Sequence, residues 1–383
     1  MKKIGIATLI TGYNFGTSLQ AFSMKQITRK IGYDAEIIIF KDSLVQGRDI
    51  RVRKLVNMFL RTIWRPKLAK QLLTIYKNSY FKTISQHAQE IFIKFEKEQL
   101  EPQKLSYRQM KQIGKRSEYC AFICGSDQIW NPSTVYINPL YFLRFAPQGK
   151  RIAYAPSFGV NEVPSFNYKL VQSYLSDIPY LSTREQQGKQ IIEDLTGQHA
   201  QVVLDPTLVL DRAFWKTKIQ KIEQEKYILF YFLNLPSKET ILMLKRIKEM
   251  INCKIVVLPY QFDEYDCFEN LEYKEVSPFE FISLIQYAEC ICTDSFHGVA
   301  FSINLNKPFF VFPRSYGHAF EQSSRITSLL SLVNLEDRYI NQERLLTEKD
   351  LQVDFTETNR VLDEEREKSL GYLKSALKII EGQ

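Results

Sequence analysis

Short apolar runs with strand character alternate with amphipathic helical segments in two separate blocks of this 383-residue chain. The first block predicts a strand at 3–9, a helix at 19–31 and a second strand at 35–40. The second block predicts strands at 227–233, 254–258, 290–293 and 309–312, separated by helices. Such alternation is typical of parallel sheets covered by helices. The predicted fold class is therefore α/β, with two Rossmann-like doubly wound domains that face a cleft.

These two blocks also set the predicted domain limits. An N-terminal Rossmann-like domain is expected at 1–205, with a basic helical insert at about 48–115. A C-terminal Rossmann-like domain is expected at 206–335, and a helical tail at 336–383 is expected to pack back on the body. A chain of this length with 45% hydrophobic residues is large enough to bury two cores.

The positive charge is concentrated in one segment. Residues 48–82 contain ten Lys or Arg and one acid, Asp49, which gives a local net charge of +9, whereas the whole chain carries +8. Because the rest of the chain is close to neutral, we expect no nucleic-acid partner. Apolar side chains, including Trp64, are interspersed with the basic ones, and one interpretation is a helix pair that lies on an anionic membrane surface. An equally weighted alternative is a solvated face of the insert.

Cysteine and histidine usage indicates the compartment. The six cysteines form no Cys-x-x-Cys pair, and the four histidines are scattered. No window reaches the roughly 18 consecutive apolar residues of a membrane-spanning helix. Residues 4–10 are interpreted as a buried strand and not as a signal peptide. We therefore expect a cytoplasmic protein without metal or cofactor, peripheral on the inner face of the cell membrane if the basic segment binds there.

A polar cluster follows the strand predicted at 290–293. Asp294, Ser295 and His297 come directly after the apolar run, and Gly298 precedes the apolar positions of the next helix. This places them at the carboxyl end of a strand and in the first turn of a helix, where backbone N–H groups favour anions. A histidine in this position suits proton transfer to or from a phosphorylated substrate. The alternative is a hydrogen-bonded core histidine.

A second polar cluster follows the strand predicted at 119–124. Ser126, Asp127 and Gln128 supply hydrogen-bonding groups, and Trp130 offers a flat apolar ring of the kind that packs on a sugar. The alternative interpretation, of equal weight, is a turn with a buried tryptophan.

Arginines further along the chain can neutralise an anion. Arg184, at the end of a short strand, can form a bidentate fork with a phosphate or carboxylate; the alternative is a surface pair with Glu185. Arg314 and Arg325 are further candidates beyond the histidine. Between them and Arg184, Asp205-Pro206-Thr207 is interpreted as an interdomain hinge, with ligand contact secondary.

In order and spacing, these motifs resemble those of the polysaccharide pyruvyl transferase family. The resemblance covers about residues 1–335 and rests on five segments: Asn14-Phe15-Gly16-Thr17-Ser18-Leu19-Gln20, Gly125-Ser126-Asp127-Gln128-x-Trp130-Asn131, Ser182-x-Arg184-Glu185, Asp205-Pro206-Thr207 and Asp294-Ser295-Phe296-His297-Gly298. It implies a fold similar to GT-B glycosyltransferases, with the site in the interdomain cleft. It also implies that a pyruvyl group passes from phosphoenolpyruvate to a sugar as a cyclic ketal. The acceptor would be a sugar or lipid-linked oligosaccharide, during assembly of an exopolysaccharide, capsule or wall polymer.

The resemblance also implies roles for individual residues. Arg184 and His297 match residues that bind phosphoenolpyruvate and serve its chemistry. Some family branches carry Arg where this chain has Ser295, so we expect either that Arg314 or Arg325 supplies the missing cation or that the donor is a different one. The donor side is completed by Asp294, Ser295 and Gly298. The acceptor side is expected to consist of Asn14, Gly16, Ser126, Asp127, Gln128 and Trp130.

Two other functions are compatible with the sequence. A GT-B glycosyltransferase with a nucleotide-sugar donor would use the same two-domain cleft. A non-catalytic subunit of a polysaccharide-assembly complex would need neither Arg184 nor His297. The sequence pattern favours no particular oligomeric state.

Overall fold

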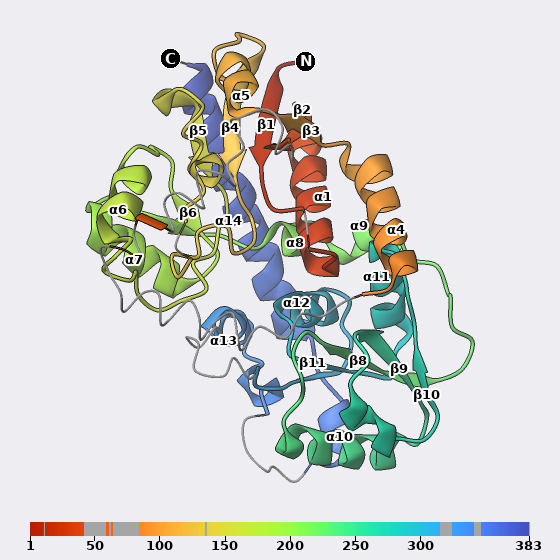
Figure 1. The fold of residues 1–383 in the computed structure, drawn as a ribbon. Coiled ribbons are helices and arrows are strands. Elements are labelled where there is room, and N and C mark those ends of the chain that lie inside the picture. The colour runs from red at the N-terminus through yellow and green to blue at the C-terminus, as the bar shows by residue number, and fades with distance from the viewer. Residues whose placement is uncertain are drawn as a thin grey trace.

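Two five-stranded parallel sheets form the framework of the protein (Figure 1). The computed structural model describes residues 1–10, 12–41, 59–60, 63, 84–134, 136–314, 324–340 and 346–382. The strand orders are β3-β2-β1-β4-β5 and β10-β9-β8-β11-β12, so both sheets have the same topology in chain order. In each sheet the direction of winding reverses beside the first strand, which is the switch point of a Rossmann-like fold. This confirms the predicted pair of Rossmann-like domains in a GT-B-like arrangement.

The first sheet and its helices come from the N-terminal half of the chain. Its strands are β1 (Lys3–Ala7), β2 (Asp34–Phe40), β3 (Gln103–Leu105), β4 (Tyr119–Cys124) and β5 (Arg151–Ala153). The helices are α1 (Phe15–Lys30), α4 (Gln86–Phe95), α5 (Tyr107–Gly114), α6 (Tyr168–Ser176) and α7 (Gln186–Thr196), with shorter turns η2 (Glu96–Leu100), η3 (Pro139–Phe142) and η4 (Gln148–Lys150). Strands β6 (Ser182–Thr183) and β7 (Gln201–Val202) pair with each other.

The second sheet follows two linking helices, α8 (Pro206–Val209) and α9 (Arg212–Lys216). Its strands are β8 (Tyr227–Phe232), β9 (Lys254–Pro259), β10 (Leu271–Tyr273), β11 (Cys290–Thr293) and β12 (Phe309–Val311). The helices are α10 (Lys238–Ile251), α11 (Pro278–Tyr287), α12 (Phe296–Asn304), α13 (Ser324–Leu332) and α14 (Thr356–Glu381), with turns η5 (Asp263–Cys267), η6 (Glu336–Arg338) and η7 (Glu348–Leu351).

The side chains of a strand alternate between two cores, as the pleat requires. In β8, Ile228 and Phe230 pack toward α10, whereas Leu229 and Tyr231 enter a core that also contains Ile6 of β1. This second core is shared by both sheets. Apolar packing therefore holds the two domains together around the site.

Two helices carry most of the contact between the halves. Helix α1 begins at the capping residue Asn14, and its first residue, Phe15, stacks on Phe281 of α11 with ring centroids 4.7 Å apart. Helix α14 runs from the second domain back along the first (Figure 1). There the hydroxyl of Tyr372 donates to the carbonyl oxygen of Ala153 in β5 (2.9 Å).

Part of the expected helical insert differs in the structure. Within 84–115 the chain is largely helical, in α4, η2 and α5, but the short strand β3 joins the edge of the first sheet by parallel pairing with β2. A segment this short could not be recognised as an edge strand from the sequence because Gln103 and Lys104 are polar. The membrane interpretation of 48–82 lies outside the described residues except for Phe59, Leu60 and Ile63. No helix in the described part of the chain is long and apolar enough to cross a membrane.

Candidate active site

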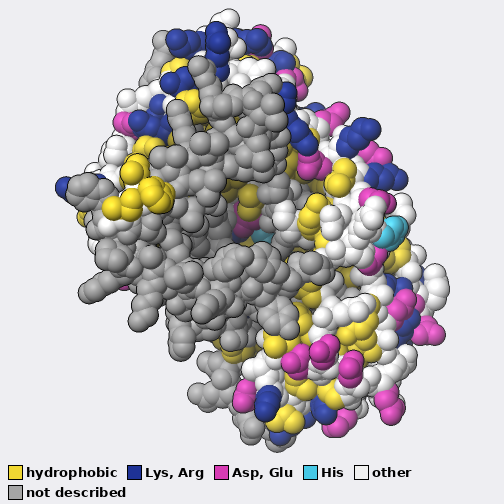
Figure 2. All heavy atoms as spheres, in the orientation of Figure 1, with side chains coloured by type: hydrophobic (Ala, Val, Ile, Leu, Met, Phe, Trp, Pro, Cys, Tyr) yellow, Lys and Arg dark blue, Asp and Glu magenta, His cyan; other side chains and the backbone are white. Residues whose placement is uncertain are grey.

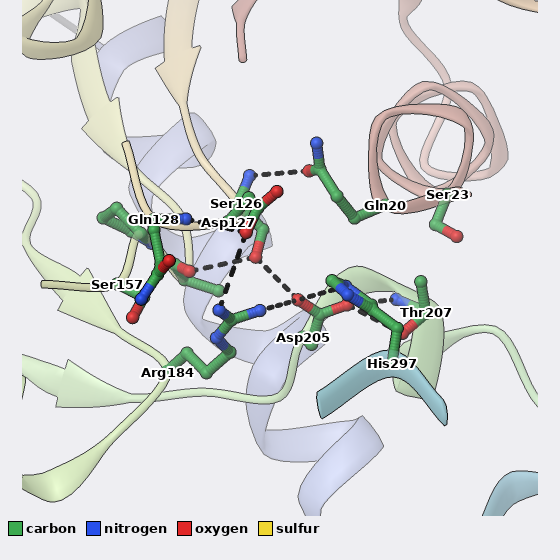
Figure 3. Close-up of polar contacts among 12 residues, drawn as sticks. Gln20, Ser23, Ser126, Asp127, Gln128, Ser157, Arg184, Asp205, Thr207 and His297 are labelled. Atoms are coloured by element: carbon green, nitrogen blue, oxygen red, sulfur yellow. Dashed lines mark hydrogen bonds and ion pairs between the residues drawn. The ribbon is translucent and has the colours of Figure 1, made fainter. Parts of the chain in front are cut away.

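Residues from four separate segments of the chain meet near the carboxyl ends of β4 and β11, one strand from each main sheet (Figure 3). Ser126 and Asp127 follow β4, Arg184 follows β6, Asp205 precedes α8, and His297 lies in the first turn of α12 after β11. Open parallel sheets bind ligands at the carboxyl ends of their strands. The parallel topology therefore brings together residues that lie up to 171 positions apart in the sequence.

Asp205 is the centre of this cluster and is almost fully buried. Its Oδ2 accepts hydrogen bonds from Ser126 Oγ (2.7 Å) and Arg184 Nη1 (2.7 Å), and lies 3.8 Å from His297 Nε2. Its Oδ1 accepts from the backbone N–H of Thr207 at 3.0 Å. Burial raises the pKa of this carboxyl, but His297 and then Arg184 outweigh burial and hold the pKa well below its usual value. The side chain is thus a carboxylate that joins both domains.

Asp127 is a second buried carboxylate in the same cluster. Its Oδ2 accepts from Thr17 Oγ1 of α1 (2.7 Å), and its Oδ1 lies 3.9 Å from Arg184 Nη2. Burial raises its pKa, but the charges of His297 and Arg184 lower it further than burial raises it. The residue has a positive φ of 67°, which aspartate tolerates better than most residues. Preceding it, Gly125 has a φ of 126°, and a Cβ there would lie 1.8 Å from the carbonyl oxygen of Tyr154.

Arg184 lies between these carboxylates with its side chain only 2% exposed. One Nη donates to Asp205, whereas Nε and Nη2 are buried without a hydrogen-bond partner. The guanidinium carbon lies 4.2 Å from the ring centroid of Phe296, a cation–π contact. The alternative of a surface pair with Glu185 is wrong, because both side chains are buried. Buried donors without partners are rare in folded proteins and indicate a place for a ligand or water.

His297 is enclosed by both domains. It is 5% exposed, and its Nε2 is buried without a hydrogen-bond partner, so it is not a fully hydrogen-bonded core histidine. The first turn of α1 lies against the imidazole, since a Cβ added to Gly16 would come within 2.0 Å of His297 Nδ1. The ring is therefore held between α1 and Asp205, with one nitrogen available.

The loop before α12 is shaped by its own polar residues. Asp294 accepts from the backbone N–H groups of Leu233 (2.7 Å) and Asn234 (3.0 Å), and Arg314 Nε donates to the same carboxylate at 3.1 Å. Ser295 caps the helix by accepting from the N–H of Gly298 (3.4 Å). Contact of Asp294, Ser295 and Gly298 with the phosphoenolpyruvate donor stays a prediction.

Arg325 is buried at the start of α13. Burial raises the pKa of Asp127, and the charge of Arg325 is one of the smaller effects that lower it, after His297, Arg184 and the Thr17 hydroxyl. Of the two arginines expected to replace the missing cation, Arg314 is bound to Asp294, and the charge of Arg325 acts on Asp127.

The predicted sugar-stacking role of Trp130 is wrong. The side chain is 1% exposed, its Nε1 donates to the carbonyl oxygen of Tyr141 (2.8 Å), and its ring stacks on Phe142 at 5.4 Å between centroids. Both faces of the indole belong to the core of the first domain. The alternative interpretation, a turn with a buried tryptophan, describes it.

The other residues expected on the acceptor side are distributed around the cluster. Ser126 is fully buried and supports Asp205, and Asn14 caps α1 by accepting from the N–H of Thr17 (3.2 Å). Gly16 faces His297, and Gln128 packs against Gly159, where an added Cβ would lie 2.0 Å from its Nε2.

Sequence reasoning missed the main role of Asp205 and that of two residues of α1. Thr17 binds Asp127, and Gln20 Oε1 accepts from the N–H of Ser126 at 3.0 Å. The available signal was position: Asp205 caps α8 shortly after β7, as Ser295 caps α12 shortly after β11.

The space-filling view shows a hollow in one face of the molecule, with histidine and acidic side chains visible at its floor (Figure 2). Among the residues that the structure describes, no group of three or more His, Cys, Asp or Glu side chains could hold a metal ion.

Similarity to solved structures is broad but weak. The chain is similar to a putative UDP-N-acetylglucosamine 2-epimerase from Listeria monocytogenes, with 12% identity, 97% of this chain and 90% of that chain covered, and a TM-score of 0.46. It is also similar to MurG from Acinetobacter baumannii (12% identity, 100% of both chains, TM-score 0.43). A third is UDP-GlcNAc 2-epimerase from Neisseria meningitidis bound to UDP-GlcNAc (12% identity, 100% and 99% covered, TM-score 0.44).

Comparison with curated proteins found no significant match. A family model, by contrast, matches residues 14–316, a range that includes the five motifs and every residue of the cluster around Asp205. This match spans well over half of the chain. The chain therefore belongs to the polysaccharide pyruvyl transferase family.

Proposed function

We propose that the protein transfers the pyruvyl group of phosphoenolpyruvate to two hydroxyls of a sugar in a lipid-linked polysaccharide precursor. The product is a cyclic ketal, and phosphate is released. Family membership supports pyruvyl transfer to a polysaccharide. The observation that carries the donor assignment is a pair of buried polar atoms without hydrogen-bond partners, Arg184 Nη2 and His297 Nε2.

The charges of the cluster suggest how donor and acceptor share the site. Three carboxylates, those of Asp127, Asp205 and Glu185, lie around Arg184, and sugar hydroxyls could donate hydrogen bonds to them. His297 lies 3.8 Å from Asp205, and the charge of Arg325 lowers the pKa of Asp127. We therefore place the phosphate of the donor toward His297, Arg325 and the start of α12, whose N-terminus favours anions.

In the proposed reaction, His297 protonates C3 of phosphoenolpyruvate while a sugar hydroxyl attacks C2. The C2–O bond then breaks, phosphate leaves with the proton of this first hydroxyl, and a second hydroxyl attacks C2 to close the ketal. Its proton returns to His297. Arg184 Nη2 holds the carboxylate of the donor, and Asp205 keeps both cations in place. General acid–base catalysis of this type contributes about 10²–10⁴ in rate.

Phosphate release and product mass test this proposal together. Purified protein is incubated with phosphoenolpyruvate and a panel of lipid-linked oligosaccharides, and the glycans are examined by mass spectrometry. We expect a product heavier by one pyruvate less water, with one phosphate released per product. His297→Gln should retain the fold and lose this activity by about 10²–10⁴.

Two results would reject the proposal. Stabilisation against heat by a UDP- or GDP-sugar but not by phosphoenolpyruvate would favour the glycosyltransferase alternative. Absence of turnover with every acceptor, together with tolerance of substitutions at Arg184 and His297, would favour a non-catalytic subunit.

We also propose that segment 48–82 brings the enzyme to an anionic membrane surface. Its described residues are apolar and exposed: Phe59 (66%), Leu60 (48%) and Ile63 (60%). Apolar side chains amid basic ones are typical of interfacial helices. Deleting 48–82 should weaken sedimentation with vesicles that contain phosphatidylglycerol but leave binding to neutral phosphatidylcholine vesicles unchanged. Equal sedimentation with both would reject the idea.

A further inference from the structure

We propose that Glu185 is the base that activates the first acceptor hydroxyl, which binds between its Oε2 and Arg184 Nε. The proposal rests on the proposed function and deepens it, because it assigns a site to the sugar.

The Glu185 carboxylate is buried but only half satisfied. The residue is 2% exposed, and its Oε1 accepts from Ser157 Oγ (2.9 Å) and from the N–H of Phe158 (3.0 Å). Its Oε2 is buried without a hydrogen-bond partner. The two bonds to Oε1 fix the carboxylate plane, and therefore the direction of Oε2.

Across from Glu185 Oε2 lies a hydrogen-bond donor, Arg184 Nε, that also has no hydrogen-bond partner. Arg184 Nε lies 3.9 Å from Glu185 Oε2, too far for a direct hydrogen bond, and has no partner of its own. Arg184 cannot swing toward Glu185 without losing its bond to Asp205 (2.7 Å) and its contact with the Phe296 ring. A donor and an acceptor are thus held apart, each buried and each incomplete.

A hydroxyl is the group that satisfies both atoms at once. Its oxygen accepts from Arg184 Nε, and its proton is donated to Glu185 Oε2. A phosphate or carboxylate would satisfy the arginine but would be repelled by Glu185, and an ammonium would have the reverse problem. The combination of a buried donor and a buried acceptor therefore selects a neutral hydroxyl, such as that of a sugar. Asp127, beside Arg184 Nη2, adds a further carboxylate that can accept hydrogen bonds from the sugar.

The position of Glu185 in its element also fits this role. It occupies the N-cap of α7, yet its side chain makes no capping bond to that helix. The carboxylate is instead turned toward the loop after β5, where Ser157 and Phe158 hold it. A serine or aspartate at this N-cap position would stabilise α7 more, because its side chain would bond to the N–H groups of the first turn. The Glu185 side chain makes no such bond.

The proposed step balances as follows. The O–H bond of the first hydroxyl breaks as its proton passes to Glu185 Oε2, and the oxygen forms a bond to C2 while C3 takes a proton from His297. The phosphate leaves with the electrons of the C2–O bond and takes the proton from Glu185. The second hydroxyl attacks C2 and returns its proton to His297. Both residues end in their starting states.

The test compares Glu185→Gln with Glu193→Gln, a matched change on the same helix. The amide oxygen of the introduced glutamine can keep the bonds to Ser157 and Phe158, so the fold and the affinity for phosphoenolpyruvate should be unchanged. We expect E185Q to lower kcat by about 10²–10⁴, with little change in KM for the donor, and E193Q to behave as the wild type. Turnover by E185Q at the rate of E193Q would overturn the proposal.

A second measurement needs neither a donor nor a variant. Wild-type crystals, as grown and after soaking in methyl β-D-galactopyranoside, are examined for an oxygen atom between Glu185 Oε2 and Arg184 Nε. We expect a water there in the first and a sugar hydroxyl in the second. Direct contact between the two side chains, with nothing between them, would overturn the proposal. Because the crystals contain no phosphoenolpyruvate, this result does not depend on whether the proposed function is correct.

Discussion

Asp205 is the residue on which both halves of the site depend. It neutralises Arg184 from the first domain and lies beside His297 from the second, with no exposed side-chain surface. Removing one partner of a buried ion pair leaves the other charge uncompensated, which costs about 3–5 kcal/mol. We expect Asp205→Asn to lower the free energy of unfolding by this amount at pH 7 and to abolish transfer.

The control for this prediction is Asp263→Asn, an exposed position at the start of η5, which should leave unfolding nearly unchanged. Chemical denaturation at several pH values gives a second check. Because the folded-state pKa of Asp205 is lowered, its contribution is complete above the unfolded pKa of about 3.9 and is lost as the pH falls below it. The difference between wild type and D205N should therefore shrink at low pH. A constant difference would contradict the assigned charge.

Gly16 permits α1 to approach His297. An added Cβ would lie 2.0 Å from Nδ1, so Gly16→Ala must displace either the helix or the imidazole. Misplacement of a catalytic group by about 1 Å can cost about 10²-fold in rate. We expect G16A to lose activity to this extent. Gly371→Ala in α14 is the matched control, because nothing lies within 4 Å of its added Cβ, and it should stabilise the helix by up to about 1 kcal/mol. Equal activity in both variants would contradict the assigned contact.

At the level of single residues, the sequence patterns predicted where a residue lies in the fold better than which residues it contacts. The rule that ligands bind at the carboxyl ends of parallel strands predicted from the sequence that Asp127, Arg184 and His297 lie near one another. It could not show that Trp130 turns into the core, because a one-residue change in a turn decides which way a ring points. It did not single out Asp205, because the strand before that residue, β7, has only two residues and lies outside the two main sheets.

At the level of elements, a local sequence motif indicated the start of a helix correctly where the whole motif is present. The Ser277-Pro278-Phe279-Glu280 pattern is the sequence signature of a capping box with proline at the first helical position, and the structure has the reciprocal capping box at the start of α11. Strand β3 lacked any such signal. Its place is set by pairing with β2 and by the bond from Gln103 Nε2 to Glu36 Oε2 (2.7 Å), which are contacts over long sequence distances.

A buried ion cluster ties the segment before β8 to the edge of the second sheet. Glu223 Oε2 accepts from Lys274 (3.0 Å) of the segment after β10 and from Lys254 (3.3 Å) of β9. Burial raises the pKa of Glu223, but these bonds and the N–H groups of Glu225 and Gln224 bring it down to about 2. The edge of the sheet is therefore acid-sensitive.

The sign of the effect follows from the lowered pKa. The unfolded chain takes up the proton at about pH 4.3, whereas the folded protein resists until about pH 2. The stabilisation by Glu223 is complete above about pH 5 and is lost as the pH falls from about 4.3 toward 2. We expect Glu223→Gln to be less stable than the wild type at pH 7, with a difference that shrinks by pH 3. Glu264→Gln, an exposed change in η5, is the control and should show no difference at either pH. Denaturant titrations at pH 7 and 3 check this, and a difference that grows in acid would contradict it.

At the scale of the whole molecule, one core crosses the domain boundary. Residues of β1 and α1 from the first sheet share it with β8, α11 and α12 from the second, and α14 closes it from the other side. Helix α14 also fixes the segment that carries Asp205: Ser369 Oγ accepts from the N–H of Leu204 (2.9 Å), and Arg366 donates to the carbonyl oxygen of Leu208 (2.8 Å). The site therefore depends on how the last helix of the chain packs.

This shared core predicts that the two domains unfold together. Leu373 of α14 is fully buried in it, so Leu373→Ala should lower the free energy of unfolding by about 2–5 kcal/mol. The loss should appear as one cooperative transition that shifts as a whole, in calorimetry and in fluorescence alike, because neither sheet has a core independent of α14 on that face. Ile379→Ala on the same helix is the matched control: its side chain is 52% exposed, and a surface change of this kind is worth within about 0.5 kcal/mol. Two separate transitions in the wild type, with only one moved by L373A, would show that the domains are energetically independent and that Asp205 is held by the first domain alone.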